Sequence, residues 1–244
     1  IQLNSGNMKT KFLLLFSLCI VILMSSCSKN DDILPEFILS EYETDLIDYF
    51  KDIALGFEFG ITNNITRKWN SGMKVFIGGE PRFELLAEFE KIRAEINELT
   101  TDGFNVTVVN DSLQSNYYIF FGSGTKYAEM FPEESNLVNS NWGLFYLLWN
   151  SQNQFYSGHM YVDIIRANSM EQKHLLREEF TQSLGLARDS QLYMESIFQS
   201  NWTTTIKYAP IDRDLIRLLY HPKMSVGLNE FEVDNALREI LSTK

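Results

Sequence analysis

The stretch MEQKHLLREEFTQSLGLARDS, residues 170–190, decides how the rest of the chain is organised. Three apolar residues recur every four positions and predict the buried stripe of an amphipathic helix: Leu176, Phe180 and Leu184. Glu178 and Gln182 lie one turn apart on a different face, with His174 one turn earlier. Gly185 follows the last apolar position and suits the left-handed conformation that closes a helix.

Residues 178–189 resemble the zinc-binding helix of the metzincin metallopeptidases with its ligands replaced. That family has the pattern H-E-x-x-H-x-x-G-x-x-H, in which three histidines bind the metal and the glutamate is the general base. Glu179 stands at the position of that base, and the three ligand positions hold Glu178, Gln182 and Arg188. The helix is also similar to that of a poorly characterised family of bacterial metzincin-like domains, which reads E-E-x-x-Q-x-L-G-L before an aspartate, here Asp189.

Two later segments extend the resemblance. Metzincins carry a methionine-bearing turn beneath the metal, and the sequence Ser196-Ile197-Phe198 resembles that turn, with Phe198 near the methionine's usual place. A segment that begins at Asp212 or Asp214 resembles the helix that follows. The resemblance covers residues 69–220 and implies a zincin-like α/β fold with a mixed sheet, a central helix and a mostly helical C-terminal part.

The N-terminal segment predicts export. Met8 is the expected natural start, Lys9 and Lys11 give it a basic character, and residues 12–24 form an apolar run. This run is too short to span a bilayer but suits a signal peptide. An uncleaved membrane anchor is the less favoured alternative.

The sequence Leu23-Met24-Ser25-Ser26-Cys27 resembles a bacterial lipoprotein cleavage site. It implies a signal peptide at residues 8–26, lipidation of Cys27 and a membrane anchor through that lipid. We expect a tether at residues 27–39, a single domain at residues 40–244, and a location on the cell surface or the periplasmic face of the outer membrane.

Composition sets further limits. A chain of 244 residues with 45% hydrophobic content can bury a sizeable core. Its net charge of -11 without a basic cluster argues against nucleic acid as a partner. Cys19 would leave with the signal and Cys27 would be acylated, so the mature domain has no cysteine for a disulfide.

Periodicity and turn signals predict the remaining elements. We expect a helix capped by Ser40, a helix with Pro81 in its first turn, and a final helix over residues 228–241 with Phe231 toward the core. We expect strands at residues 73–77, 104–109 and 117–121, a turn at 122–124, and a hairpin of residues 144–149 and 155–165. The hairpin makes the predicted α/β sheet mixed rather than purely parallel.

The replaced ligands argue against a standard zinc site, because Arg188 puts a positive charge where a ligand belongs. We expect no cofactor, with zinc as the alternative, and structural roles for the histidines His159, His174 and His221. One hypothesis is a polar network in which Glu178 pairs with Arg188 and Gln182 joins them. The other is that Arg188 points to solvent and Glu178 is paired locally. Asp189 is expected to cap the turn that follows rather than to bind a metal.

These observations favour a lipid-anchored envelope protein that no longer hydrolyses peptides. The former substrate cleft, edged by residues 144–149, would bind an extended peptide or a glycan. Four aromatic residues are candidates for that surface: Trp142, Phe145, Tyr146 and Trp149. One alternative is a hydrolase that uses Glu178, Glu179 and Asp189 with a metal or as paired carboxylates. Another is a structural subunit of an envelope complex.

Overall fold

The computed structural model describes residues 38–58 and 63–243. Residues Leu39–Lys244 form one compact unit. The predicted signal peptide and Cys27 lie outside the described residues, so the domain boundaries and the lipidation stay predictions. In the described part, none of the helices is long and apolar enough to cross a membrane.

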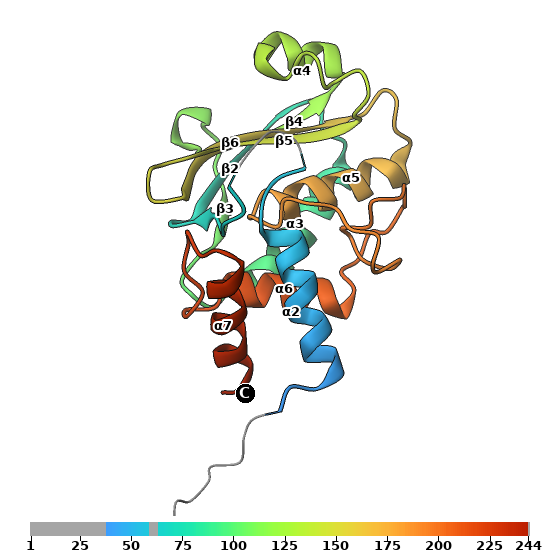
Figure 1. The fold of residues 1–244 in the computed structure, drawn as a ribbon. Helices are drawn as coiled ribbons and strands as arrows, with labels where there is room; N and C mark the ends of the chain where they lie inside the picture. The colour runs from blue at the N-terminus through green and yellow to red at the C-terminus, as the bar shows by residue number, and fades with distance from the viewer. Residues whose placement is uncertain (1–37, 59–62, 244) are drawn as a thin grey trace, which may run out of the picture. The chain divides into compact units, whose positions relative to one another are not determined.

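A six-stranded sheet is the centre of this unit (Figure 1). Its strands follow the order β1-β6-β4-β2-β3. Strand β5 is outside this order and pairs with β6 along the edge opposite to the one that pairs with β4. Every pair is parallel except β5 with β6, which is antiparallel. The strands are β1 (Lys68–Trp69), β2 (Met73–Gly79), β3 (Val106–Val108), β4 (Tyr117–Gly122), β5 (Gly143–Trp149) and β6 (Gln154–Asp163). The mixed α/β class and the hairpin are therefore confirmed.

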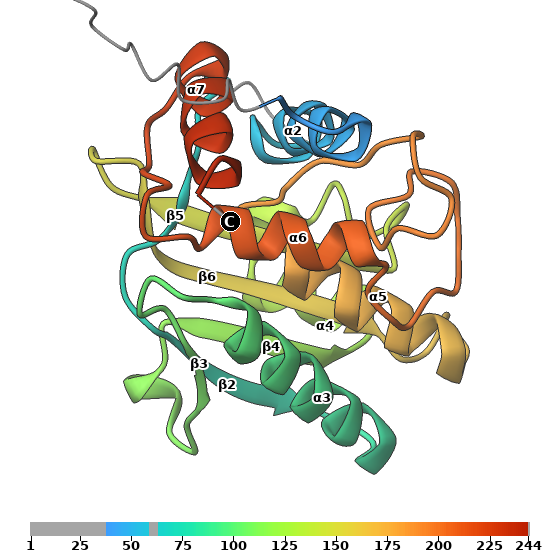
Figure 2. The same ribbon diagram turned by 90° about the horizontal axis from the view of Figure 1, so that it is seen from below.

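Helices cover both faces of the sheet. Figures 1 and 2 show α3 and α5 against one face, α4 on the other, and α2, α6 and α7 beyond α3 and α5. The described helices are α2 (Glu41–Ala54), α3 (Phe83–Leu99), α4 (Gly124–Met130), α5 (Ser169–Gln182), α6 (Pro210–Leu219) and α7 (Glu230–Leu241). The main core lies between the sheet and the helices on the α3 and α5 side, including α2, α6 and α7. A smaller cluster lies beneath α4.

The central helix α5 forms as its sequence predicts. Asn168 accepts hydrogen bonds from the backbone amides of Met170 and Glu171, and the Glu171 side chain closes a capping box. The predicted stripe is fully buried: Leu176, Phe180 and Leu184. Gly185 has φ 116°, and a Cβ there would lie 2.1 Å from the Arg67 carbonyl oxygen. Only glycine fits this position, and it turns the chain toward the cleft.

Three local expectations are wrong. Ser123, expected in a turn, caps α4 by accepting a hydrogen bond from the Lys126 amide. Pro81 precedes the N-cap Arg82 instead of lying in the first turn of α3. Phe231 was expected toward the core but is 74% exposed. Phe231 lies about 180° around α7 from the buried Ile240, so it is on the face that points away from the core.

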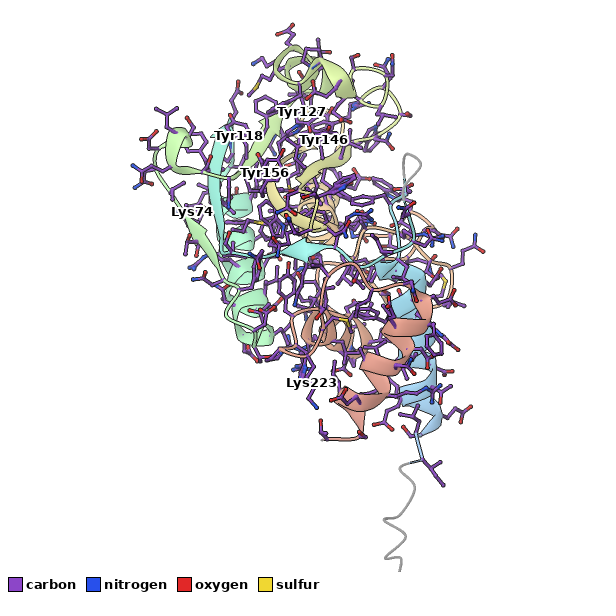
Figure 3. The ribbon with its side chains drawn as sticks, turned by 60° about the vertical axis from the view of Figure 1, so that its left-hand side comes forward. Lys74, Tyr118, Tyr127, Tyr146, Tyr156 and Lys223 are labelled. Atoms are coloured by element: carbon purple, nitrogen blue, oxygen red, sulfur yellow. The ribbon has the colours of Figure 1, made fainter. Side chains whose placement is uncertain are left out.

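Figure 3 shows that Tyr118, Tyr127 and Tyr146 gather on the α4 side of the sheet. The Tyr127 hydroxyl is 2.6 Å from Nδ1 of His159, and the Tyr146 ring stacks on the His159 ring. His159 is therefore a core residue of this face, and burial lowers its pKa to about 4. The predicted structural role of His159 agrees with these contacts.

Candidate functional site

A cleft of about 580 Å³ opens between α5, the start of β5 and the loop that contains residues 199–202. Its lining is mainly polar. The side chains from α5 are Glu171, His174, Leu175, Glu178, Glu179 and Gln182. Asp189 and Glu58 reach the cleft from the loops after α5 and after α2. The one-turn spacing of His174, Glu178 and Gln182 thus brings all three to the same cavity.

Glu178 is paired within its own helix. Its Oε2 lies 3.3 Å from Nε2 of His174, and Nδ1 of His174 lies 2.7 Å from the carbonyl oxygen of Thr205. Burial lowers the pKa of His174, but Glu178 and the Thr205 carbonyl outweigh it, so that the pKa is raised overall. The pair therefore favours the protonated form of His174.

Glu179 lies directly beneath the first residue of β5. A Cβ on Gly143 would lie 2.6 Å from Glu179 Oε1 and 2.9 Å from its Cγ, so the absence of a side chain at Gly143 makes room for this carboxyl group. Burial raises the pKa of Glu179 well above its ordinary value, and Glu178, Asp189 and Glu58 raise it further. Burial and the neighbouring carboxylates thus favour the protonated form of Glu179.

Asp189 accepts a hydrogen bond from Gln182, with Nε2 and Oδ1 2.5 Å apart. Burial, followed by the charges of Glu178 and Glu58, raises its pKa to about 7, while Gln182 and His174 act in the opposite direction. Asp189 was expected to cap the turn that follows it, and this expectation is wrong. Its side chain instead accepts its one hydrogen bond from a described residue of α5, Gln182.

Arg188 does not belong to this cluster, so the predicted pairing of Glu178 with Arg188 is wrong. Its Nη1 donates to the carbonyl oxygen of Leu55 at 3.3 Å, and its side chain lines a separate cavity with Asp48 and Asp52. Arg188 and Asp189 are neighbours whose side chains leave the chain toward different cavities. Asp189, rather than Arg188, therefore meets Gln182, and the local pairing of Glu178 is the alternative that holds.

The turn predicted beneath the site is buried and supports the cleft without lining it. Ser196 Oγ donates to Asp212 Oδ1 at 2.6 Å, and the Ile197 amide donates to Asp212 Oδ2 at 3.0 Å. Phe198 is fully buried. Asp212 also accepts the Ala209 amide at the start of α6, so one carboxylate joins the turn to this helix. Burial raises the pKa of Asp212 to about 6.

The side chains at the positions that match the metzincin ligands do not fit a zinc ion. In a zinc site, three or four nitrogen, sulfur or carboxylate donors point toward one position. In residues 38–58 and 63–243, no group of three or more His, Cys, Asp or Glu side chains has such an arrangement. Gln182 is bonded to Asp189 and Glu178 to His174, while Arg188 points elsewhere. The side chains are thus engaged with one another in pairs.

A second cavity of about 440 Å³ runs along β5 and is more apolar. Phe145, Leu147 and Trp149 line it from the strand, and Phe57 stacks on Trp149 with ring centroids 5.4 Å apart. Both cavities are lined by Glu58, Asn141, Gly143 and Glu179, so they meet beneath the start of β5. Three of the predicted aromatic residues lie here: Phe145, Tyr146 and Trp149. Trp142 lines the acidic cleft, where its ring meets that of Trp202 edge-on at 5.5 Å.

Sequence reasoning missed Phe57 and Glu58. They follow α2 in a segment without helical or strand periodicity, and only the fold brings them to β5. Glu58 is fixed there by its backbone amide, which donates to the carbonyl oxygen of Ala187 at 3.0 Å. No local pattern in the sequence contains this long-range contact.

The backbone of β5 has one unpaired edge. The amide of Asp163 donates to the Trp142 carbonyl, so Trp142 and Asp163 form a hydrogen-bonded antiparallel pair. Hydrogen-bonded and non-hydrogen-bonded pairs alternate along an antiparallel ladder, so every second residue of β5 turns its N–H and C=O groups away from β6. These residues are Gly143, Phe145 and Leu147. Among the described residues, no other strand pairs with this edge.

Comparison with known families identifies one model that matches most of the compact unit. The family is described as a protein of unknown function, DUF2927, and its model matches residues 43–239. The matched range contains β5, α5 and the five carboxyl residues that line the cleft, Glu58, Glu171, Glu178, Glu179 and Asp189. A search of the curated proteins gives no match.

Proposed function

The chain belongs to the DUF2927 family, and we propose that it binds an extended peptide along β5 without hydrolysing it. We further propose that the domain is a metzincin-like scaffold whose zinc site has been replaced, and that a lipid on Cys27 holds it in the cell envelope. The proposed location rests on the predicted signal peptide and the lipoprotein cleavage site alone. The binding role follows from the site.

The observation that carries the binding role is the unpaired edge of β5 above a cleft. An extended peptide can add a strand to such an edge, because its backbone pairs with the exposed N–H and C=O groups while its side chains enter adjoining pockets. Gly143, Phe145 and Leu147 offer those groups, and the two cavities adjoin them. An edge of this kind otherwise favours association with other chains.

The metzincin kinship is supported by three features that belong together. The helix with the degenerate motif lies under the antiparallel edge strand, Gly185 has the left-handed conformation expected after the motif, and the turn at Ser196 lies against the next helix. In such a scaffold, the former substrate cleft keeps its shape when the metal ligands are exchanged.

The absence of hydrolysis is proposed from the state of the remaining side chains. A general base must be ionised and within reach of the water that it activates. Glu179 has a strongly raised pKa, and the donors around it are paired with one another. Glu179 at the former base position is therefore poorly suited to accept a proton.

One observation favours a second function, that of a hydrolase. Glu178 is paired with His174 while burial raises the pKa of Glu179, and two neighbouring carboxyl groups in such different environments are the pattern of an acid–base pair. The substrate would then be a glycan or a peptide cut without zinc or with an atypical ligand set. Stoichiometric zinc in the purified protein, lost in Glu178→Ala, would favour a metal-dependent enzyme.

The experiment that separates these functions incubates the full chain with short fluorescent peptides. Fluorescence anisotropy measures binding, and mass spectrometry of the same samples measures cleavage. We expect saturable binding with every peptide recovered intact. Cleavage that is abolished by Glu179→Gln would establish the hydrolase, and no binding by any peptide would remove the proposed function.

A further inference from the structure

The two cavities beside β5 differ in chemistry, and this difference specifies a ligand. We infer that the bound peptide carries a basic side chain in the acidic cleft and an apolar side chain, two positions away, in the cavity along β5. The inference rests on the proposed function, because it assumes that the ligand is a peptide strand paired with β5. It adds the class of sequence that this strand must have.

The acidic cleft carries more acidic than basic side chains among the described residues. Its lining contains five carboxyl side chains, from Glu58, Glu171, Glu178, Glu179 and Asp189, and no lysine or arginine among the described residues. His174 is already paired with Glu178. A Lys or Arg side chain would replace repulsion among these groups with attraction, whereas an acidic side chain would add to the repulsion.

Raised pKa values of two of these carboxyl groups agree with this repulsion. Glu179 and Asp189 both have pKa values above their ordinary range, first because of burial and then because of neighbouring carboxylates. The clustered acids therefore cost free energy in the unliganded protein. A bound cation would lower these pKa values and recover part of that cost.

The cavity along β5 is lined by four glutamates, Glu58, Glu133, Glu134 and Glu179, but its wall along the strand offers apolar contacts. Phe57 and Trp149 stack at its far end, and Trp149 is 38% exposed. Phe145 and Leu147 complete its inner side. An aromatic or aliphatic side chain placed here would bury apolar surface of both partners, which stabilises a complex by about 25 cal/mol per Å² before the costs of association.

Strand geometry sets the spacing between the two side chains. If a residue of an added strand pairs with Gly143, its side chain lies on the face of the sheet that α5 covers, next to Glu179. Side chains on one face of a strand alternate with period two, so the next one on this face lies opposite Phe145, beside the apolar cavity. A basic residue with an apolar residue two positions away therefore reaches both cavities at once.

The direction of the added strand does not alter the test if the probe is symmetric. The probe is an acetylated, amidated peptide with the core phenylalanine–threonine–lysine–threonine–phenylalanine, extended by threonine on both sides. Two matched peptides replace the lysine with glutamine or with glutamate, and a third replaces both phenylalanines with serine. Binding of each to the full chain is measured by fluorescence anisotropy.

We expect the lysine peptide to bind about tenfold or more tightly than the glutamate peptide, with the glutamine peptide between them. We expect the serine peptide to bind several-fold more weakly than the lysine peptide. Glu58→Gln and Glu178→Gln should weaken the lysine peptide and leave the glutamine peptide nearly unchanged. Glu84→Gln, on the exposed side of α3, makes the same charge change outside the site and is the matched control.

Circular dichroism establishes that each variant is folded. Of the two substitutions, Glu58→Gln should disturb the fold less. Glu58 is exposed, and its side chain has no hydrogen bond to another described residue. Equal affinity for the lysine and glutamate peptides, or tighter binding of the glutamate peptide, would overturn the inference but leave peptide binding intact. Failure of all four peptides to bind would instead overturn the proposed function.

Discussion

Asp189→Asn should stabilise the domain at alkaline pH. The pKa of Asp189 is raised from 3.8 to about 7, so the folded state holds the proton more tightly than the unfolded state does. The folded state is therefore favoured fully below the unfolded pKa, and this contribution is lost as pH rises through about 7. Asparagine keeps an oxygen that accepts the Gln182 hydrogen bond, but it carries no charge.

The magnitude follows from the difference between the two pKa values. A difference of about three units corresponds to an upper limit of about 4 kcal/mol at 1.36 kcal/mol per unit. Asp189 is only partly buried, and solvent screens its repulsion by Glu178 and Glu58, so we expect a gain of about 1 to 2 kcal/mol near pH 8. The gain near pH 5 should be roughly a third as large, because that pH lies about one unit above the unfolded pKa.

Urea unfolding of both proteins near pH 5 and pH 8 measures this gain. Asp45→Asn, on the exposed side of α2, is the matched control and should show no such pH-dependent gain. An Asp189→Asn variant no more stable than the wild type near pH 8 would refute the electrostatic description of the cleft. A gain of the same size at both pH values would refute it as well, because it would not depend on ionisation.

Three other predictions test the framework around the site. Gly185→Ala should lower the free energy of unfolding by about 2 kcal/mol or more, because φ is 116° and the new Cβ would meet the Arg67 carbonyl; thermal unfolding measures the loss. Asp212→Ala should cost about 2 to 4 kcal/mol in urea unfolding, since it leaves the Ile197 and Ala209 amides without their acceptor; a loss below 0.5 kcal/mol would contradict this role. Cys27→Ser should abolish incorporation of radiolabelled palmitate and membrane association in a Gram-negative host; unchanged labelling would contradict lipidation at this residue.

Local patterns predicted the central elements well. The four-residue spacing of Leu176, Phe180 and Leu184 identified α5, and Asn153, with a positive φ of 62°, lies in the turn of the predicted hairpin. Both signals involve residues close in sequence, where helix and strand periods are fixed by backbone geometry. Ser123 shows the limit of such patterns, because a Gly-Ser-Gly sequence suits both a turn and a helix N-cap.

The candidate site was predictable only where it lies on one helix. The face of α5 that carries His174, Glu178 and Gln182 follows from their spacing alone. The direction in which the Arg188 side chain leaves the turn after Gly185 does not, because packing of the following segment decides it. Glu58 reaches the cleft through a contact with the segment after α5, far away in the sequence, and no pattern near Glu58 records that contact.

The central claim is that a peptide strand pairs with the open edge of β5. Amide hydrogen exchange of the full chain, measured residue by residue with and without a saturating lysine peptide, tests it most directly. We predict slower exchange at Gly143, Phe145 and Leu147 in the complex, and little change at Leu144 and Tyr146, whose amides already face β6. Saturable binding that leaves the exchange of Gly143, Phe145 and Leu147 unchanged would contradict the claim.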